Sequence, residues 1–200
     1  MKFKYKKRIL ILIIMIGVCF TNVSYAITPM LKCKCSRGTN ISYYIENGNE
    51  NVFEQNKHIS NAIKNWEHTG HGYNPIYMKR KNNNKGTAID FHHARKDHWN
   101  NVGNFKNYIM GETVHRNGHG TGIDGNIQNW LFSDIYLCID NLGPKTYGEI
   151  QGTIAHEIGH AFGLDEYYNN RNSIMYPILD YRLVHTVQKE DNDAINKKYR

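Results

Sequence analysis

The sequence lacks internal repeats and Pro/Ser-rich linkers, and it contains only four prolines in 200 residues. Without a repeat, a solenoid or an array of small modules is excluded. Without a linker, and with a length that suits one compact domain, two separately folded parts are not expected. We therefore predict one domain, which spans residues 27–200 once an N-terminal export signal is set aside.

The export signal is predicted from a stretch that has no charge at all. Residues 9–20 form an unbroken apolar run, which follows a basic head at residues 2–8 and precedes small residues at Ser24 and Ala26. This order is typical of a secretory signal peptide. The run is much shorter than the roughly 20 residues that a membrane-spanning helix needs. We expect residues 1–26 to be a cleaved signal peptide, and the protein to be secreted without a stable membrane anchor.

The predicted domain also lacks a strong charge imbalance. The whole chain has 25 basic and 18 acidic side chains, a formal net charge of +7, but residues 1–26 carry five of the basic ones and no acidic one. Residues 27–200 therefore have a net charge of only +2. The basic character belongs mostly to the export signal, so no nucleic-acid partner is expected.

Cysteine is scarce after the signal peptide. The remaining three are Cys33, Cys35 and Cys138, and an odd number leaves at least one thiol unpaired. Cys33 and Cys35 are too close in sequence to pair without strain. The sequence leaves two alternatives open: a disulfide from one of these two to Cys138, or free thiols.

What the sequence does contain is an alternation of strand and helix patterns. Runs rich in β-branched and aromatic residues predict strands, and the Gly-, Asn- and His-rich segment Phe91–Gly125 is predicted to be a long loop. The predicted strands are Asn40–Ile45, Ile76–Met78, Thr87–Phe91 and Ser133–Asp140.

Two helices flank this pattern. Asn51 and Glu54 form a capping pair ahead of an apolar stripe at helical spacing that ends at Trp66. Thr186–Tyr199 is predicted to be a polar surface helix that packs through Val187, Ala194 and Ile195.

A third helix carries the chemistry. Thr146 and Glu149 form a capping box, and the isoleucines that follow at intervals of four residues predict a buried stripe. His156 lies about 200° around the helix from that stripe, and His160 follows one turn later on the same side. Two imidazoles at this spacing reach one metal ion, and Glu157 beside them reaches a water bound to that ion.

Zinc suits this set of side chains. Neutral imidazoles bind Zn²⁺, and a catalytic zinc site keeps one position open for water. The metal lowers the pKa of that water and polarises a carbonyl group, and Glu157 is the predicted general base. Gly163 ends the helix where the chain turns back, which brings Asp165 or Glu166 toward the metal as third ligand.

The segment HEIGHAFGLDE, followed by Ser173–Pro177 (SIMYP), resembles the metzincin metalloproteases and, among them, most closely the matrixins. This resemblance implies an α+β catalytic domain, with a twisted, mixed, mostly parallel sheet that has an antiparallel edge strand, an active-site helix and a C-terminal helix. It also implies that Met175 forms the Met-turn beneath the metal. The position of the family's third histidine holds Glu166 here, which we predict to be the third ligand; Asp165 and His185 are the alternatives.

Matrixins also carry a structural zinc, and the resemblance points to Asp97, His98 and one of His115 or His119 as its ligands. The position where a further histidine is expected holds Tyr136. The alternative is a solvated loop with scattered imidazoles. Calcium could be bound by the same acidic and Asn-rich loop, but no ligand spacing marks it.

The function implied is that of a secreted, monomeric zinc endopeptidase that hydrolyses extracellular proteins or peptides. The substrate is expected to add a strand along Ser133–Asp140, and residues after Pro177, including Tyr181, are expected to line the pocket for the side chain that follows the cut. Tyr176 either stabilises the oxyanion or packs against its apolar neighbours. The alternatives are a catalytically weak or inactive binding protein of the same fold, and a zinc hydrolase that acts on cell-wall amide bonds.

Overall fold

The computed structural model describes residues 27–46, 52–98 and 108–200. The predicted signal peptide and the predicted cap at Asn51 lie outside the described residues, so the prediction of residues 1–26 remains a prediction. Within the described part, no helix is long and apolar enough to cross a membrane.

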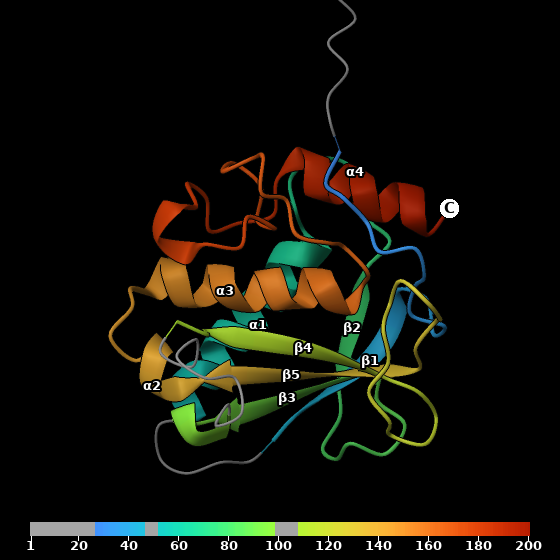
Figure 1. The fold of residues 1–200 in the computed structure, drawn as a ribbon, viewed down its shortest axis with the longest axis horizontal. Coiled ribbons are helices and arrows are strands. Elements are labelled where there is room, and N and C mark those ends of the chain that lie inside the picture. The colour runs from blue at the N-terminus through green and yellow to red at the C-terminus, as the bar shows by residue number, and fades with distance from the viewer. Residues whose placement is uncertain (1–26, 47–51, 99–107) are drawn as a thin grey trace, which may run out of the picture.

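A five-stranded mixed sheet forms one layer of the fold (Figure 1). Its order is β2-β1-β3-β5-β4, in which the first four strands run parallel and β4 pairs with β5 in the antiparallel direction. The strands are β1 (Asn40–Ile45), β2 (Tyr77–Arg80), β3 (Ile89–Ala94), β4 (Gly111–Arg116) and β5 (Phe132–Cys138). The predicted architecture, a mixed sheet with an antiparallel edge strand, is confirmed.

Two of the predicted segments are wrong in part. The predicted loop Phe91–Gly125 contains β4, whose sequence GETVHR has Val114 as its one large apolar residue and so lacks the alternation that predicts a strand. Ser133–Asp140 does not lie at the edge, since β5 pairs with β3 on one side and with β4 on the other. Its last residues leave the sheet as the short helix α2 (Ile139–Leu142).

The helices cover one face of the sheet. Helix α1 (Val52–Glu67) packs against α3 (Tyr147–Ala161), where the indole of Trp66 donates a hydrogen bond of 2.8 Å to the Ala155 carbonyl oxygen. The apolar side chains of both helices and of one sheet face form a single core cluster. Figure 1 shows α3 running alongside β4, which places the histidine-bearing helix next to the edge strand.

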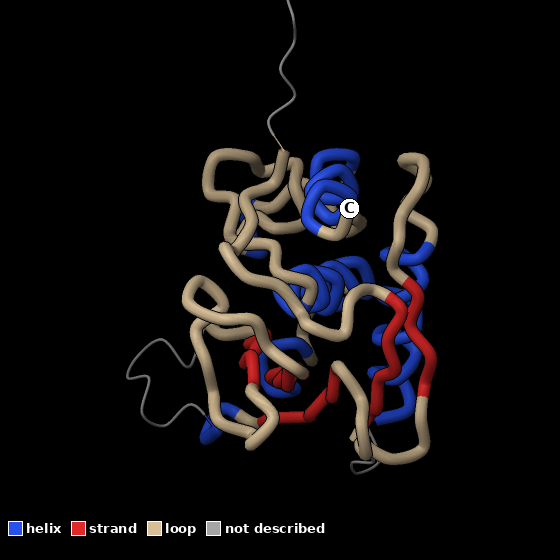
Figure 2. Tube along the Cα trace, turned by 90° about the vertical axis from the view of Figure 1, so that its right-hand side faces the viewer, coloured by secondary structure: helices blue, strands red, loops and turns tan. Residues whose placement is uncertain are grey.

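The chain after α3 forms a smaller part above the sheet. Figure 2, a side view, shows α3 and α4 (Lys189–Lys198) almost end-on, one above the other. The buried carboxylate of Asp191 on α4 accepts hydrogen bonds from the hydroxyls of Thr28 and Ser173 and from the backbone N–H groups of Ile174 and Gln188. This carboxylate therefore ties the N-terminal segment and the predicted Met-turn to α4.

The three described cysteines are all free, which agrees with the second of the two alternatives that the sequence left open. The backbone of Cys35 forms an isolated β-bridge with Trp130, which lies just before β5. Cys138 is the last residue of β5. Strand β5 alone, which separates the two sites, spans roughly 20 Å at about 3.3 Å per residue. A disulfide requires Cα atoms within about 7 Å of each other, which this arrangement excludes.

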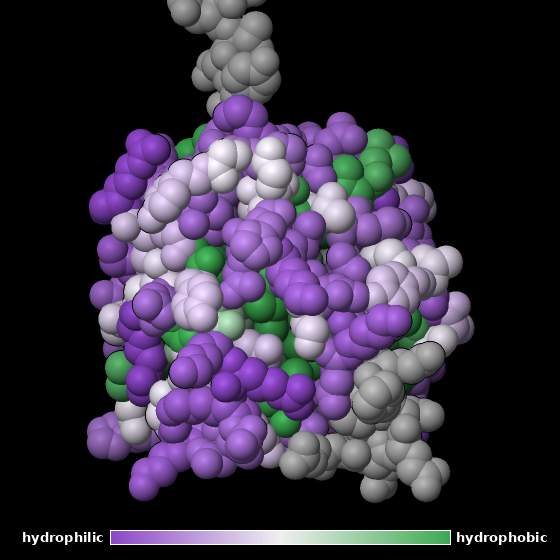
Figure 3. Space-filling view, turned by 180° about the vertical axis from the view of Figure 1, so that it is seen from behind, coloured by the Kyte–Doolittle hydropathy of each residue, from purple (hydrophilic) through white to green (hydrophobic). Residues whose placement is uncertain are grey.

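The side of the molecule that faces away in Figure 1 is mostly hydrophilic. Figure 3 shows its apolar residues in small separate patches among polar side chains, near the centre, at the left edge and at the upper right. The described residues of that face therefore form no broad apolar surface of the kind that marks a large protein interface.

Candidate active site

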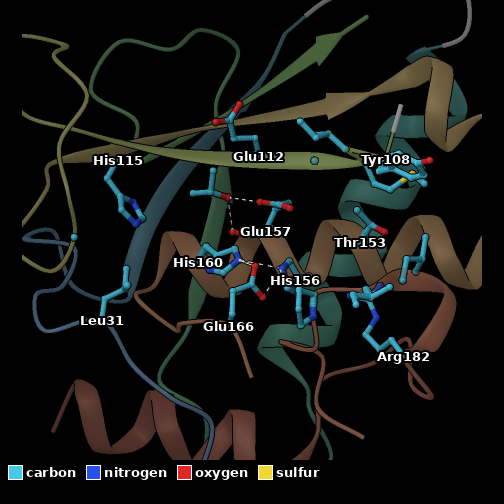
Figure 4. A pocket seen from close by; sticks show the side chains of 18 of the residues that line it. Leu31, Tyr108, Glu112, His115, Thr153, His156, Glu157, His160, Glu166 and Arg182 are labelled. Atoms are coloured by element: carbon cyan, nitrogen blue, oxygen red, sulfur yellow. Dashed lines mark hydrogen bonds and ion pairs between the residues drawn. The ribbon is translucent and has the colours of Figure 1, made fainter. Parts of the chain in front are cut away.

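Helix α3 begins at the capping box that the sequence predicts, and it buries the predicted face. The Thr146 hydroxyl accepts a hydrogen bond from the Glu149 N–H, and the Glu149 carboxylate accepts one from the Thr146 N–H at 2.8 Å. Ile154 and Ile158 are fully buried, so this face of α3 is fixed against the core. The opposite face carries His156 and His160 into the cleft beside β4 (Figure 4).

The helix ends where Gly163 turns the chain back. Gly163 has a φ of +87°, a left-handed conformation that side chains with a Cβ rarely adopt. Its N–H bonds to the His160 carbonyl oxygen, and the Leu164 N–H bonds to the Gly159 carbonyl oxygen, which is the Schellman pattern. The turn brings Glu166 back over the two histidines, as predicted.

Both histidines are oriented by backbone carbonyl groups. His156 Nδ1 lies 2.9 Å from the Ile174 oxygen, and His160 Nδ1 lies 3.0 Å from the Leu164 oxygen. A carbonyl oxygen only accepts, so each Nδ1 carries the proton and each neutral ring has a lone pair on Nε2. The two Nε2 atoms face each other at 3.0 Å (Figure 4).

The Glu166 carboxylate completes this group. Its two oxygens each lie 3.5 Å from one of the Nε2 atoms, and its buried Oε2 has no hydrogen-bond partner. Among the residues that the structure describes, His156, His160 and Glu166 form the one group of three whose ligand atoms all lie within 4.8 Å of each other. Two converging lone pairs and an unsatisfied carboxylate oxygen fit a bound cation, and two imidazoles with one glutamate are a known zinc ligand set.

The electrostatics of the group also favour a positive charge at its centre. Burial alone would lower the pKa of His160, but the adjacent Glu166 and the charge of Glu157 raise it to about 9. Burial alone would raise the pKa of Glu166, but the two imidazoles hold it far below its usual range. The carboxylates therefore stabilise an added proton here, and a bound metal cation would provide the same compensation.

The two alternatives for the third ligand lie outside this group. The Asp165 carboxylate accepts a hydrogen bond of 2.8 Å from the Glu166 N–H, so it supports the backbone of the turn. His185 packs on α3, where a Cβ added to Gly148 would lie 3.0 Å from its Cδ2 atom. The structure brings neither side chain to the two Nε2 atoms.

Glu157 is held on the β4 side of the same centre. Its Oε2 accepts a hydrogen bond of 2.7 Å from the Thr113 hydroxyl, and its side chain lies against Gly111. A Cβ at Gly111 would come within 2.8 Å of Glu157 Cγ, so a glycine is needed for this placement. Gly111 and Thr113 were missed in the sequence because the strand that carries them was not predicted.

A cleft of about 630 Å³ runs past these groups. The edge strand that lines it is β4, not Ser133–Asp140, which corrects the predicted substrate strand. The segment after Pro177 lines the opposite wall as predicted, through Ile178, Leu179 and Arg182, whereas Tyr181 is exposed and packs on Arg171 instead.

Two further residues of the predicted Met-turn region have different surroundings. Met175 is fully buried beneath α3, where a Cβ added to Gly159 would lie 2.4 Å from its Sδ atom. This is the place that the Met-turn prediction requires. Tyr176 is not among the residues that line the cleft, so its packing alternative has the better structural support.

A comparison with protein families agrees with this geometry. Residues 34–200 match the matrixin family model. The chain belongs to the matrixin family. Matrixins are zinc metalloproteases, so this domain is of the zinc metalloprotease type. A search among curated proteins finds no significant match.

The described residues of this matrixin domain do not bring together the second metal site that the resemblance implies. Asp97 and His98 line a shallow pocket with Tyr136, on which His98 stacks. His115 lies in the main cleft, and His119 is exposed in the turn after β4. Because alternate residues of a strand point to opposite faces, His115 and Tyr136 lie on opposite sides of the sheet. Among the described residues, none of the four predicted ligands belongs to a metal-binding group.

His115 has a packing role instead. Its ring stacks on Trp130 with centroids 3.9 Å apart, and its Nδ1 lies 3.1 Å from the Ser133 hydroxyl. Burial, followed by the charge of His160, lowers its pKa from 6.5 to about 4. The folded matrixin domain therefore favours the neutral form of the His115 ring.

This burial predicts an acid-dependent loss of stability. The pKa of His115 is depressed in the folded state, so its contribution to stability is complete above about pH 6.5 and is lost as the pH falls toward about 4. Urea unfolding of chelated protein is expected to show that His115→Gln removes about 2 kcal/mol of the stability difference between about pH 7.5 and about pH 5. The matched change in the exposed His119, His119→Gln, should leave this pH dependence unaltered. If the unfolding free energy depends on pH equally in both variants, the lowered pKa of His115 is contradicted.

Gly111 gives a second prediction. Gly111→Ala places a methyl group against the Glu157 side chain and displaces its carboxylate, so kcat/KM on a cleaved peptide is expected to fall by about 100-fold. Zinc content should stay unchanged, because His156, His160 and Glu166 do not contact this position. Gly122→Ala is the control, since a Cβ there meets its nearest atom at an ordinary 3.7 Å. Similar activities of the two variants would show that Gly111 does not position Glu157.

Proposed function

We propose that this matrixin domain is a secreted zinc endopeptidase that hydrolyses peptide bonds in extracellular proteins or peptides. The observation that carries the proposal is the convergence of His156, His160 and Glu166 on one point, with the carboxylate of Glu157 beside it in an open cleft. Secretion is inferred from the signal-peptide pattern of residues 1–26.

In this proposal, His156, His160 and Glu166 hold the zinc ion. Zinc bound there supplies a Lewis acid that polarises the scissile carbonyl and lowers the pKa of a water molecule. The carbonyl groups of Ile174 and Leu164 fix the protons on Nδ1 of the two histidines and so keep both Nε2 lone pairs directed at the metal.

Glu157 acts as the proton carrier. Its carboxylate accepts a proton from the attacking water and delivers it to the leaving amine. The Thr113 hydroxyl occupies one carboxylate oxygen, which restricts the orientation of the side chain and leaves the other oxygen for this exchange. Glu157 and Glu166 are the two carboxylates whose charges raise the pKa of His160.

The edge strand β4 provides the surface for an extended substrate. Gly122 and Ile123 cover its outer edge at the His115–Arg116 end, and the part from Gly111 to Thr113 lines the cleft. A peptide that pairs with this part passes directly over Glu157 and the two histidines. Binding by strand addition uses the peptide backbone, which suits an enzyme that cuts within a chain.

The experiment that tests this function is proteolysis with and without a chelator. Purified protein of residues 27–200 is expected to cleave unfolded casein and members of a peptide library, to lose this activity fully with a zinc chelator, and to regain it when zinc is added. Cleavage of cell-wall amide bonds in place of peptides would support the alternative hydrolase. Zinc binding without cleavage of either substrate would indicate a binding protein of the same fold and overturn the proposal.

A further inference from the structure

The cleft contains a buried cation that the proposed chemistry does not use. Arg182 is 6% exposed and lines the cleft. Its Nη1 donates a hydrogen bond of 3.2 Å to the Ile174 carbonyl oxygen, which also accepts from His156. Its Nε and Nη2 atoms are buried and have no hydrogen-bond partner among the described residues. A guanidinium group is thus held with two donors unsatisfied.

The local sequence makes room for this guanidinium. Gly152 lies on α3 one turn before His156, and a Cβ added there would lie 3.1 Å from Nη2 of Arg182. The absence of a side chain at this position lets the guanidinium approach the helix. Arg182 is therefore fixed beside α3 on the same side as the first histidine.

No partner of opposite charge contacts this group. The charges of Glu157, Glu166, Asp191 and Glu149 act on it from a distance, and none of the ion pairs in the described part of the chain includes Arg182. Asp180, which also lines the cleft, pairs with Lys145 at 2.8 Å. Burial lowers the pKa of Arg182 to about 10, so it remains charged at neutral pH. A buried cation with unused donors is costly unless an anion joins it.

The position of Arg182 in the cleft indicates where such an anion would come from. Figure 4 shows Arg182 on the same side of His156 as Thr153 and Tyr108, whereas His115 and Leu31 lie at the other end. The Arg182 side is formed by the segment after Pro177, which is expected to receive the side chain that follows the cut. A carboxylate is the group that a guanidinium binds best, through two parallel hydrogen bonds.

We propose that Arg182 makes this pocket select substrates with an aspartate or glutamate directly after the cleaved bond. The carboxylate of that side chain pairs with the guanidinium where Arg182 lines the cleft and neutralises the buried charge. This inference rests on the proposed function, since it assigns the substrate preference of the same site. A free C-terminal carboxylate offers the same chemistry, and the experiment separates the two sources.

The first test uses the unchanged protein and four peptides of one sequence. The residue after the cut is Glu, Gln or Leu in three amidated peptides, and the fourth is the Gln peptide shortened to end at that residue with a free carboxylate. The Glu peptide is expected to have a kcat/KM at least about tenfold above those of the Gln and Leu peptides, because hydrogen bonds to a charged partner are strong. Preference for the Leu peptide overturns the proposal. Preference for the shortened peptide overturns it in favour of C-terminal carboxylate binding.

The second test assigns the preference to Arg182. Arg182→Gln is expected to abolish the preference of Glu over Gln, chiefly through KM, whereas Arg182→Lys should keep part of it. The control is Arg80→Gln, because Arg80 is exposed on β2 at the opposite edge of the sheet from the cleft and should leave the preference unchanged. A preference that survives in Arg182→Gln contradicts the assignment.

A binding measurement separates this inference from the proposed function. Calorimetric titration of chelated, metal-free protein with the Glu and Gln peptides requires no hydrolysis and is expected to show tighter binding of the Glu peptide, again lost in Arg182→Gln. Tighter binding without any cleavage by the zinc-loaded protein would refute the peptidase and keep the acidic pocket. Cleavage with equal binding and equal kcat/KM would keep the peptidase and refute the acidic pocket.

Discussion

Replacing Glu157 with glutamine is expected to lower kcat on a cleaved peptide by about 100- to 10,000-fold, the range that general acid–base catalysis contributes. Glutamine has nearly the same shape but cannot accept and return a proton at neutral pH. Its amide still accepts a hydrogen bond from the Thr113 hydroxyl, so the packing against Gly111 is preserved. The loss should therefore fall on kcat, with little change in KM.

The control for this variant lies on the same helix. Glu149→Gln changes a glutamate to a glutamine in the capping box of α3, where glutamine still accepts from the Thr146 N–H, so both stability and activity are expected to persist. Zinc content measured by mass spectrometry should be one ion per chain in both variants. A Glu157→Gln protein with normal kcat would remove Glu157 from the mechanism, and one that loses its zinc would show that Glu157 acts through the metal site instead.

The features that the sequence predicted well are those determined by contacts within a few residues. The capping box at Thr146, the four-residue spacing of His156 and His160, and the left-handed turn at Gly163 are all local, so the spacing of residue types defines their geometry. The same turn predicted that Glu166 returns to the two histidines. The parallel strand β1 was predicted with its bounds because its alternating Ile and Tyr residues lie in the middle of the sheet.

The features that were missed depend on neighbours far away in the sequence. Strand β4 has the polar sequence of a loop, and it is a strand because β5 supplies its hydrogen-bond partners. Because β4 is the edge strand, the surface proposed for the substrate moves from Ser133–Asp140 to the first residues of β4, which line the cleft. The unpartnered guanidinium of Arg182 could not be recognised either, because only the fold shows that this residue is buried beside α3. A sequence gives residue types at such positions but not their surroundings.

Glu166→Ala is expected to have the largest effect on the metal. Removing a residue that only supports a zinc ligand typically lowers affinity by about 10- to 100-fold, so removal of a direct ligand should exceed about 100-fold. Only His156 and His160 would remain, and their Nε2 lone pairs face each other at 3.0 Å without the compensating carboxylate. Competition with a chromogenic zinc chelator measures the loss. Asp165→Ala should keep its zinc, because that carboxylate bonds to the backbone of the turn.

The variant Glu166→His turns this comparison into a test of charge. It restores the third histidine that the matrixin pattern has at this position, so we expect zinc to be retained while one negative charge leaves the site. With three neutral ligands the ion keeps more of its positive charge, and the acidic limb of the pH–rate profile should move to lower pH than in the unchanged protein. If instead Glu166→Ala keeps one zinc per chain at full affinity, the third ligand is another residue, and Asp165→Ala and His185→Ala would then identify it. If Glu166→His binds zinc but its profile does not move, the charge of Glu166 does not set the acidity of the site.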